Sequence, residues 1–462
     1  MTTPDTSAPA CNCGQFCCGC GLCAAVCPRG VLEMRFDEAG ELKPFRLDDR
    51  CGKSCRLCRQ VCPFSDDLPD EDALAQELFA GVPGIARHPI TGYYLGAMVG
   101  YSLAHRERGA SGGLATWTLQ TLLERGEVDA VACVAPREDG HPLFEFKLCR
   151  TGEEVRACSR SAYYPVHVGN VVRQILKSPG RYAVIALPCV CKAIRLAMHK
   201  LPVLRERVRY VLGLVCGQGK SAFFAEAVCA LGGGDPARLS SLVCRVKAPD
   251  RPASDFGMTF TCTHGSLPEE GTVFWTEGIE WMWADRAFTP LACDFCDDVF
   301  AECADAVFMD AWLPAYVPDS RGHNLALIRQ PCMADLLSSA PSGELALRPL
   351  PIADVIRSQL GAIAGKRPYL TLRMKIAAAE GIRPPKKRTH LWKTAFQFGR
   401  AQVVSSCWAI ARQSGKLWPS VGRSTPCFES GLELPRRTLA RSRLFTRRMR
   451  YINRLLRIGA RL

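Results

Sequence analysis

Eight cysteines in two short blocks are the residues of this sequence best suited to carry chemistry. The first block, Cys17 to Cys27, has the spacing Cys-x2-Cys-x2-Cys-x3-Cys-Pro, and the second, Cys51 to Cys62, has Cys-x3-Cys-x2-Cys-x3-Cys-Pro. A [4Fe–4S] cluster needs four thiolates; three come from one tight loop and the fourth from a remote block. The spacing therefore predicts two [4Fe–4S] clusters and transfer of single electrons.

The ligand sets follow from this crossed pattern. We expect one cluster on Cys17, Cys20, Cys23 and Cys62, and the other on Cys51, Cys55, Cys58 and Cys27. Zinc also binds paired cysteines, but it fits two such frames poorly. Three cysteines near the blocks fall outside the frames, and we expect them to be bystanders: Cys11, Cys13 and Cys18.

Four further thiols are placed to form a third metal site. Cys189 and Cys216 each lie at the end of an expected strand, and Cys293-x2-Cys296 adds a pair downstream. If the two strands are parallel neighbours, both thiols lie at the carboxyl edge of the sheet, where α/β folds place their sites. Taken singly, each of these cysteines is more often a buried, inert residue.

The elements that must position these thiols alternate between strand and helix. Because helices separate the strands, parallel βαβ units are expected. The segment 256–283 is rich in Thr, Phe and Trp, which favours added antiparallel strands. We expect an α/β (α+β) fold: a ferredoxin-like 2[4Fe–4S] domain at 1–75, a linker at 76–105, a mixed-sheet α/β domain at 106–365 and a basic, partly helical segment at 366–462. The expected helices are 113–125, 168–177, 192–200 and 221–231, and the expected strands are 130–135, 182–187 and 210–215.

Two glycine-rich segments invite comparison with phosphate-binding loops. Residues 108–113 lead into an expected helix, where free backbone N–H groups could bind a cofactor phosphate, although an ordinary helix cap explains them too. Residues 217–221 read Gly-Gln-Gly-Lys-Ser, but Leu214 stands where a P-loop needs glycine. A nucleotide triphosphatase is therefore not expected.

In their order along the chain, these motifs resemble the family of beta subunits of coenzyme F420 hydrogenase/dehydrogenase, whose members are iron–sulfur flavoproteins. The similarity extends over about residues 10–365. The matching stretches are Ser111-Gly112-Gly113-x2-Thr116, Ser161-Ala162-Tyr163, Pro188-Cys189, Cys216-Gly217-x2-Lys220-Ser221, Arg245-x-Lys247, Cys293-x2-Cys296-x8-Asp305 and Asp310-Ala311-Trp312.

The resemblance implies an FAD in the α/β domain and a third [4Fe–4S] cluster beside it. The implied cluster ligands are Cys189, Cys216, Cys293 and Cys296, and the implied FAD-binding residues are Ser111, Gly112, Gly113, Thr116, Ser161 and Tyr163. The chain departs from the family pattern at Val190, where a polar residue is usual. Cys303 is an alternative cluster ligand.

Clusters pass single electrons, whereas FAD exchanges an electron pair. We therefore expect an oxidoreductase that takes electrons from ferredoxin or a redox partner subunit to FAD, for two-electron chemistry on an unidentified small molecule. The alternatives are a non-catalytic electron-transfer subunit of a larger redox complex and a DNA-binding regulator. Tyr163, His167 and Lys192 are proton donors by type, and Trp275, Trp281 and Trp283 either cover the flavin or pack in the core.

Charge is distributed unevenly. Residues 366–462 hold 23 of the 59 Lys and Arg but 3 of the 45 Asp and Glu, so this segment carries +20 and the rest of the chain −6. The helical pattern at 436–462 favours an amphipathic surface helix on a bilayer or a protein, against a solvated tail or, less favoured, nucleic-acid binding. With no run of 18 apolar residues and a polar beginning, we expect a cytoplasmic protein, with the inner membrane surface as an option.

Overall fold

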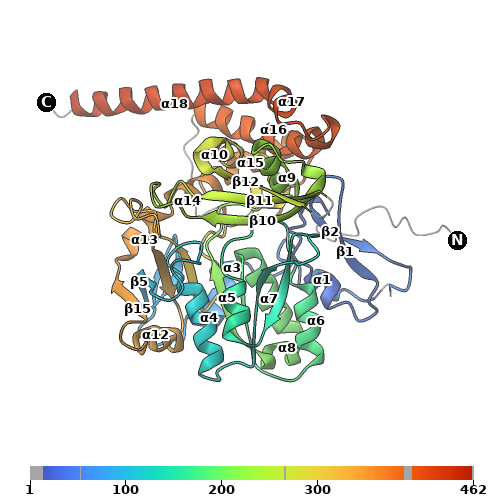
Figure 1. Cartoon of the computed structure of the whole chain (residues 1–462), viewed down its shortest axis with the longest axis vertical. Coiled ribbons are helices and arrows are strands. Elements are labelled where there is room, and N and C mark those ends of the chain that lie inside the picture. The colour runs from blue at the N-terminus through green and yellow to red at the C-terminus, as the bar shows by residue number, and fades with distance from the viewer. Residues whose placement is uncertain (1–13, 52–53, 265–266, 390–397, 460–462) are drawn as a thin grey trace.

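The computed structural model describes residues 14–51, 54–264, 267–389 and 398–459 (Figure 1). Cys11 and Cys13 lie outside the described residues. An eight-stranded sheet with helices forms the lower body in Figure 1, a three-stranded sheet lies above it, and a layer of C-terminal helices lies at the top.

The large sheet is mixed, as the sequence predicted. Its strand order is β15-β5-β14-β13-β9-β8-β6-β7. Strands β6, β8, β9 and β13 run parallel, whereas β7, β14, β5 and β15 join antiparallel. The strands are β5 (Gly96–Ser102), β6 (Ala130–Pro136), β7 (Phe144–Cys149), β8 (Tyr182–Ala186), β9 (Val208–Leu214), β13 (Ala306–Asp310), β14 (Asn324–Ile328) and β15 (Leu345–Pro349).

Helices cover both faces of this sheet. On one face α6 (Gly169–Lys177), α7 (Pro188–Lys200) and α8 (Pro202–Arg207) bury aliphatic residues, and on the other α4 (Leu114–Glu124) and α12 (Pro331–Ser338) do so. The predicted helices and parallel pairs are confirmed. The helix expected from residue 192 begins at Pro188, because proline is well suited to the first helical position.

The three-stranded sheet is antiparallel, in the order β10-β11-β12. Its strands are β10 (Leu239–Val246), β11 (Gly257–His264) and β12 (Leu267–Phe274). The antiparallel strands expected within 256–283 are therefore confirmed up to residue 274. Beyond it the chain turns through η3 (Trp275–Glu277) into the short helix α10 (Ile279–Ala284), where Ile279 and Met282 are buried. The helix α9 (Phe223–Leu231) packs on this sheet.

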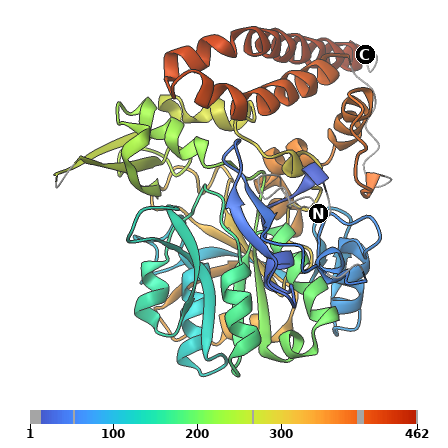
Figure 2. The same cartoon turned by 90° about the vertical axis from the view of Figure 1, so that its right-hand side faces the viewer.

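The N-terminal segment has the form of a small ferredoxin-type unit. It comprises η1 (Gly14–Phe16), α1 (Leu22–Ala25), the hairpin of β1 (Leu32–Phe36) and β2 (Leu42–Arg46), and α2 (Leu57–Gln60). Figure 2 shows it lying along the α/β body, and α1 and α2 contact α6 and α7. The elements α3 (Glu71–Phe79), β3 (Ala86–His88) and β4 (Gly92–Tyr94) lead from it to β5.

The basic C-terminal segment is mostly helical and is packed on the rest of the chain. Trp418 is fully buried, with its ring 5.9 Å from that of Phe288, and Arg388 is buried among carboxylates. Leu444 and Phe445 are exposed on the last helix. No helix among the described residues has the length and apolarity to cross a bilayer. The helices α13 (Ile352–Ser358) and α14 (Leu360–Lys366) lead into this segment, whose own helices are α15 (Leu370–Ala379), α16 (Phe398–Ser420), α17 (Thr425–Gly431) and α18 (Glu433–Gly459).

Candidate cofactor and cluster site

A cavity of about 1250 Å³ lies at the carboxyl edge of the parallel strands. This exceeds the roughly 300–1,000 Å³ of a site for a small ligand. Its wall includes Cys17 and Cys18 of the ferredoxin-type segment as well as residues that follow β8 and β9. The N-terminal segment and the α/β body therefore share one internal space.

The four cysteines expected to hold a third cluster all line this cavity. Cys189 lies in the first turn of α7, after β8, and Cys216 follows β9, the parallel neighbour of β8. Cys293 lies in the short helix α11 (Leu291–Asp294), and Cys296 follows it. The expectation that Cys189 and Cys216 share one sheet edge is confirmed, because the chain crosses from strand to helix at both places on the same side.

Two N–H donors point at sulfur atoms of this quartet. The backbone N–H of Gly219 donates to Cys293 Sγ at 3.2 Å, and the ammonium of Lys366 donates to Cys296 Sγ at 3.2 Å. Hydrogen bonds to cluster sulfurs are one of the means by which proteins set cluster potentials. The loop at 217–221, which resembles a phosphate-binding loop in sequence, thus donates a hydrogen bond to the thiol of Cys293.

Lys366 is buried beside the quartet, in surroundings that favour its charged form. Burial disfavours its ammonium, but the negative charges of Cys296, Cys216 and Cys293 outweigh this effect and raise the pKa of the lysine above its ordinary value. Its Nζ also donates to the carbonyl oxygen of Asp298 at 2.6 Å. In sequence this lysine is only the first residue of a basic segment, and no local motif marks it.

Cys303 and Cys18, expected to be an alternative ligand and a bystander, lie in different surroundings. Cys303, the alternative ligand, is buried in an apolar cluster with Leu74 and Leu196, away from the cavity wall. Cys18 lines the cavity, and its thiol interacts with those of Cys20 and Cys189. Cys18, expected to be a bystander, therefore lies between a ferredoxin-type cysteine and the quartet.

The ferredoxin-type cysteines lie in two neighbourhoods. Cys23, Cys27 and Cys58 pack against one apolar cluster, whereas Cys62 packs against another, which Cys18 and two of the quartet, Cys189 and Cys296, also contact. Cys17 and Cys20 are buried, and Cys51 and Cys55 are exposed. The ligand sets remain a prediction: Cys17 and Cys18 in the first block line the cavity with the quartet, and Cys62 of the second block packs against the same apolar cluster as two of the quartet.

Gly21 shows how closely this segment approaches the α/β body. It has φ +77°, and an added Cβ would lie 2.9 Å from Cβ of His167. The backbone N–H of Val168 donates to the carbonyl of Cys20 at 3.0 Å. His167 therefore packs against the cysteine loop, and burial lowers its pKa to about 4.

The Ser-Gly-Gly turn forms another part of the cavity wall. Gly113 caps α4 with φ +78°, where glycine is favoured, and a Cβ there would lie 2.7 Å from His105. Ser111 Oγ donates to the carbonyl of His323 at 2.7 Å. Of the residues that the resemblance implies for FAD, all line the cavity except Gly112: Ser111, Gly113, Thr116, Ser161 and Tyr163.

Cationic side chains surround this turn. Arg245 Nε donates to the carbonyl of Ala110 at 3.2 Å, and Lys247 Nζ donates to that of Ser111 at 2.8 Å. Burial lowers the pKa of Lys247 to about 8, and the Arg245 guanidinium adds to this effect, against the charge of Glu107. An anionic group at the turn would relieve this repulsion.

Three residues of the cavity wall have strained backbone conformations. Arg160, Arg245 and Arg286 line the cavity with φ values of +109°, +65° and +68°. Such conformations are costly for residues with a Cβ, and they cluster at functional sites.

Aromatic rings complete the wall. Tyr163 lies 5.1 Å from Trp283, which lies 5.7 Å from Trp275, and all three line the cavity. Burial raises the pKa of Tyr163 to about 12. Trp281 instead packs near Phe428. Among the proposed proton donors, Lys192 is paired with Glu71 at 3.2 Å and, like His167, is not part of the wall.

The fold and these thiols define an iron–sulfur redox protein with a dicluster segment docked on an α/β domain. Three family models match the chain: 4Fe-4S dicluster domain over residues 16–65, and the N-terminal and C-terminal parts of coenzyme F420 hydrogenase/dehydrogenase, beta subunit, over residues 97–173 and 180–351. The chain belongs to the family of coenzyme F420 hydrogenase/dehydrogenase beta subunits, which confirms the resemblance.

Individual relatives match parts of the chain. One subunit of the F(420)H(2) dehydrogenase of Methanosarcina mazei is 23% identical over 44% of this chain and 53% of its own length. Coenzyme F420-dependent sulfite reductase of Methanocaldococcus jannaschii is 26% identical over 43% of this chain and 30% of its own length. A chain in a structure of the F420-reducing [NiFe] hydrogenase complex from Methanosarcina barkeri is 15% identical, with TM-score 0.48, covering 65% of this chain and 99% of that one.

Proposed function

We propose that this protein is an iron–sulfur flavoprotein oxidoreductase subunit. Single electrons from ferredoxin or a redox partner subunit would enter through two N-terminal [4Fe–4S] clusters. They would pass through a third cluster on Cys189, Cys216, Cys293 and Cys296 to FAD. The single observation that carries the proposal is the shared cavity, because one wall holds this thiol quartet and the Ser-Gly-Gly turn.

The donor chemistry supports a third iron–sulfur cluster. Four thiols from three chain segments converge, and two of them accept N–H donors. Among the described residues, one group of three possible ligand atoms lies within 4.8 Å, and it belongs to other cysteines. The sulfur atoms of the quartet are therefore farther apart than the ligand atoms of a single metal ion. This wider spacing suits a cluster of four irons and four sulfides.

The contacts of Cys18 support an electron path into the cavity. Its thiol meets Cys20, an expected ligand of the first cluster, and Cys189, an expected ligand of the third. Cys62, the expected remote ligand of the first cluster, packs in the same group as Cys189. The first and third clusters would thus be neighbours, while the exposed Cys51 and Cys55 would hold the second cluster near the surface, where a partner can dock.

FAD, when bound, supplies the exchange of an electron pair that clusters lack. The residues around the Ser-Gly-Gly turn fit its phosphates: the α4 N-terminus provides N–H groups, and Arg160 and Arg245 on the cavity wall provide positive charge. Lys247 lies outside the wall and holds the turn through the carbonyl of Ser111. Tyr163, Trp275 and Trp283 offer flat apolar surfaces for a ring system. The same rings would exclude water from the reacting end.

The substrate is proposed by class. Both curated relatives carry coenzyme F420 in their names, so a deazaflavin is the first candidate to exchange an electron pair with the flavin. We also propose that the chain divides at residues 75, 105 and 365, and that the basic C-terminal segment makes a second contact with a protein or a membrane surface.

Anaerobic purification with iron, sulfide and flavin analysis tests this function. We expect about twelve irons, the content of three [4Fe–4S] clusters, and one FAD per chain. Cys216→Ser should remove about four irons, whereas Cys332→Ser, at an exposed cysteine outside the cavity wall, should remove none. About eight irons without flavin would favour the non-catalytic electron-transfer subunit and overturn the flavoenzyme.

A further inference from the structure

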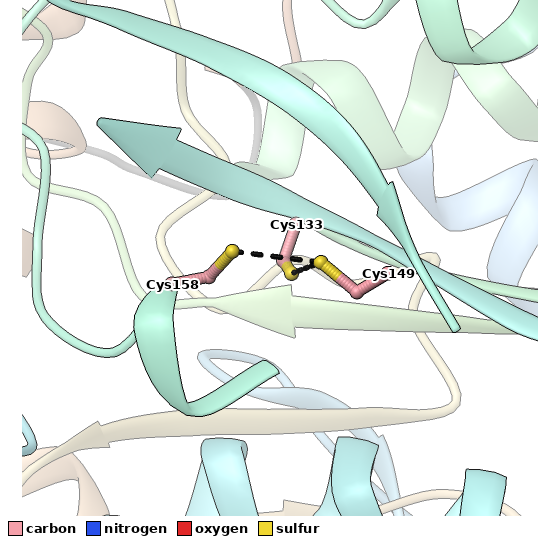
Figure 3. Close-up of side chains that lie close together, drawn as sticks. All are labelled: Cys133, Cys149 and Cys158. Atoms are coloured by element: carbon pink, nitrogen blue, oxygen red, sulfur yellow. Dashed lines mark hydrogen bonds between the residues drawn. The ribbon is translucent and has the colours of Figure 1, made fainter. Parts of the chain in front are cut away.

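Three cysteines outside every predicted site converge in the α/β domain. Cys133 lies on β6, Cys149 ends β7, and Cys158 follows the helix α5 (Gly152–Ala157). The Sγ of Cys149 lies 3.6 Å from that of Cys133 and 3.5 Å from that of Cys158, and all three sulfurs lie within 4.8 Å of one another. Figure 3 shows the three side chains pointing toward a common centre.

Strand register and a helix cap produce this convergence. β6 and β7 pair antiparallel with Cys133 opposite Lys147 and Val131 opposite Cys149, so the two cysteines are diagonal neighbours on one face of the sheet. Cys158 caps the end of α5, whose start is held by a capping box of Thr151 and Glu154. Three elements, the paired strands β6 and β7 and the helix α5, therefore direct one thiol each toward one point.

We propose that Cys133, Cys149 and Cys158 bind one zinc ion. Tetrahedral zinc with Zn–S bonds of about 2.3 Å places its thiolates about 3.8 Å apart. The observed separations of 3.5 and 3.6 Å are close to this value and too short for an iron–sulfur cube. A disulfide needs sulfurs about 2.05 Å apart and would leave the third thiol unused.

The fourth coordination position faces the cavity. Cys133 and Cys158 belong to its wall, whereas Cys149 is completely buried behind them. A zinc with three protein ligands and one open position holds water or a ligand atom, as catalytic zinc sites do. Ser161, on the same wall, lies three residues after Cys158, so the ion would adjoin the space proposed for FAD.

Close thiols alone do not make a site in this chain. Cys229 and Cys262 also meet, at 3.3 Å, but they are two thiols within an apolar core and are not part of the cavity wall. The trio differs in having a third ligand and an opening. The nearby Lys147 and Glu154 pair with each other at 3.7 Å, so a bound cation would be the effective counter-charge for three thiolates.

Zinc and iron analysis of the full chain tests the inference. We expect one zinc per wild-type chain purified without oxygen, and at least a tenfold lower zinc content in Cys158→Ser with unchanged iron. Cys332→Ser is the matched control and should keep its zinc. X-ray absorption at the zinc edge should show three sulfur neighbours and one lighter atom.

A second measurement on the wild type avoids dependence on the variant's folding. After chelation, Cys133 and Cys158 should react with iodoacetamide, and added zinc should protect both. Zinc that survives in Cys158→Ser, a four-sulfur zinc environment, a disulfide within the trio or alkylation unaffected by zinc would each overturn the site. Because iron and flavin are measured separately, failure here is distinct from failure of the proposed flavoenzyme.

Discussion

Replacing Lys366 with methionine tests the third cluster through its electrostatics. The lysine Nζ lies 3.2 Å from Cys296 Sγ, and the side chain is buried. A reduced cluster carries one more negative charge than an oxidised one, and a nearby ammonium stabilises that extra charge. Removing the ammonium should therefore make the midpoint potential of this cluster more negative.

The size of the shift follows from the distance. With the added electron centred about 6 Å from Nζ and an effective dielectric constant of about 20, Coulomb's law gives about 3 kcal/mol. For a one-electron couple, about 59 mV corresponds to a tenfold change, so the shift should be about 120 mV. At the dielectric constant of bulk water it would fall to about 30 mV.

The assay is a redox titration followed by electron paramagnetic resonance. One of three couples should shift while the two N-terminal couples stay in place, and Lys366→Arg should keep the original value because it retains the charge. Lys375→Met, at an exposed position on α15, is the control and should leave all three couples unchanged. A shift below about 30 mV, or a shift in the positive direction, would refute the reasoning.

Three other predictions concern the body of the fold and the flavin site. Arg388→Met should lower the free energy of unfolding by about 3–5 kcal/mol, because the buried carboxylate of Asp297, 2.8 Å away, would lose its ion pair while Glu302 would keep Arg367, whereas Arg437→Met at an exposed pair should cost less than about 1 kcal/mol; equal losses in denaturant titrations would contradict this. Gly113→Ala should lose most of its flavin but keep its iron, because a Cβ at φ +78° meets His105; flavin and iron assays check it, and full flavin content would count against the turn as its site. Lys247 should make FAD binding weaken as pH rises through about 8, because its ammonium holds the turn through the Ser111 carbonyl and loses its proton there; Lys247→Met should abolish this dependence in Kd measurements, and an unchanged pH profile would remove Lys247 from the support of the turn.

Some features of this protein can be predicted from short stretches of its sequence. Three of the four thiolates of a cluster come from one loop, so the spacing in each block is enough to predict the two N-terminal clusters. The alternation of buried strands and helices predicts the parallel pairs, because each element is identified by its own periodicity. The edge shared by Cys189 and Cys216 follows from that alternation alone.

Other features depend on contacts between distant segments. Lys366 reaches Cys296, and Arg388 reaches Asp297 and Glu302, although composition assigned both cations to a basic segment outside the body. Charge counts describe a stretch of chain without saying what it packs against, so ion pairs between remote elements stay hidden. Cys18 appeared to be a bystander because its contact with Cys189 joins positions 171 residues apart.

The convergence of Cys133, Cys149 and Cys158 is another feature that sequence alone does not predict. Composition alone reveals 26 cysteines, but Cys133, Cys149 and Cys158 have none of the spacing of a metal motif. Their convergence depends on the register of β6 with β7 and on the end of α5, and a shift of one residue would turn a cysteine to the other face. Metal ligands that one loop supplies can therefore be predicted from sequence. Ligands from separate elements come together only when tertiary packing sets the strand register.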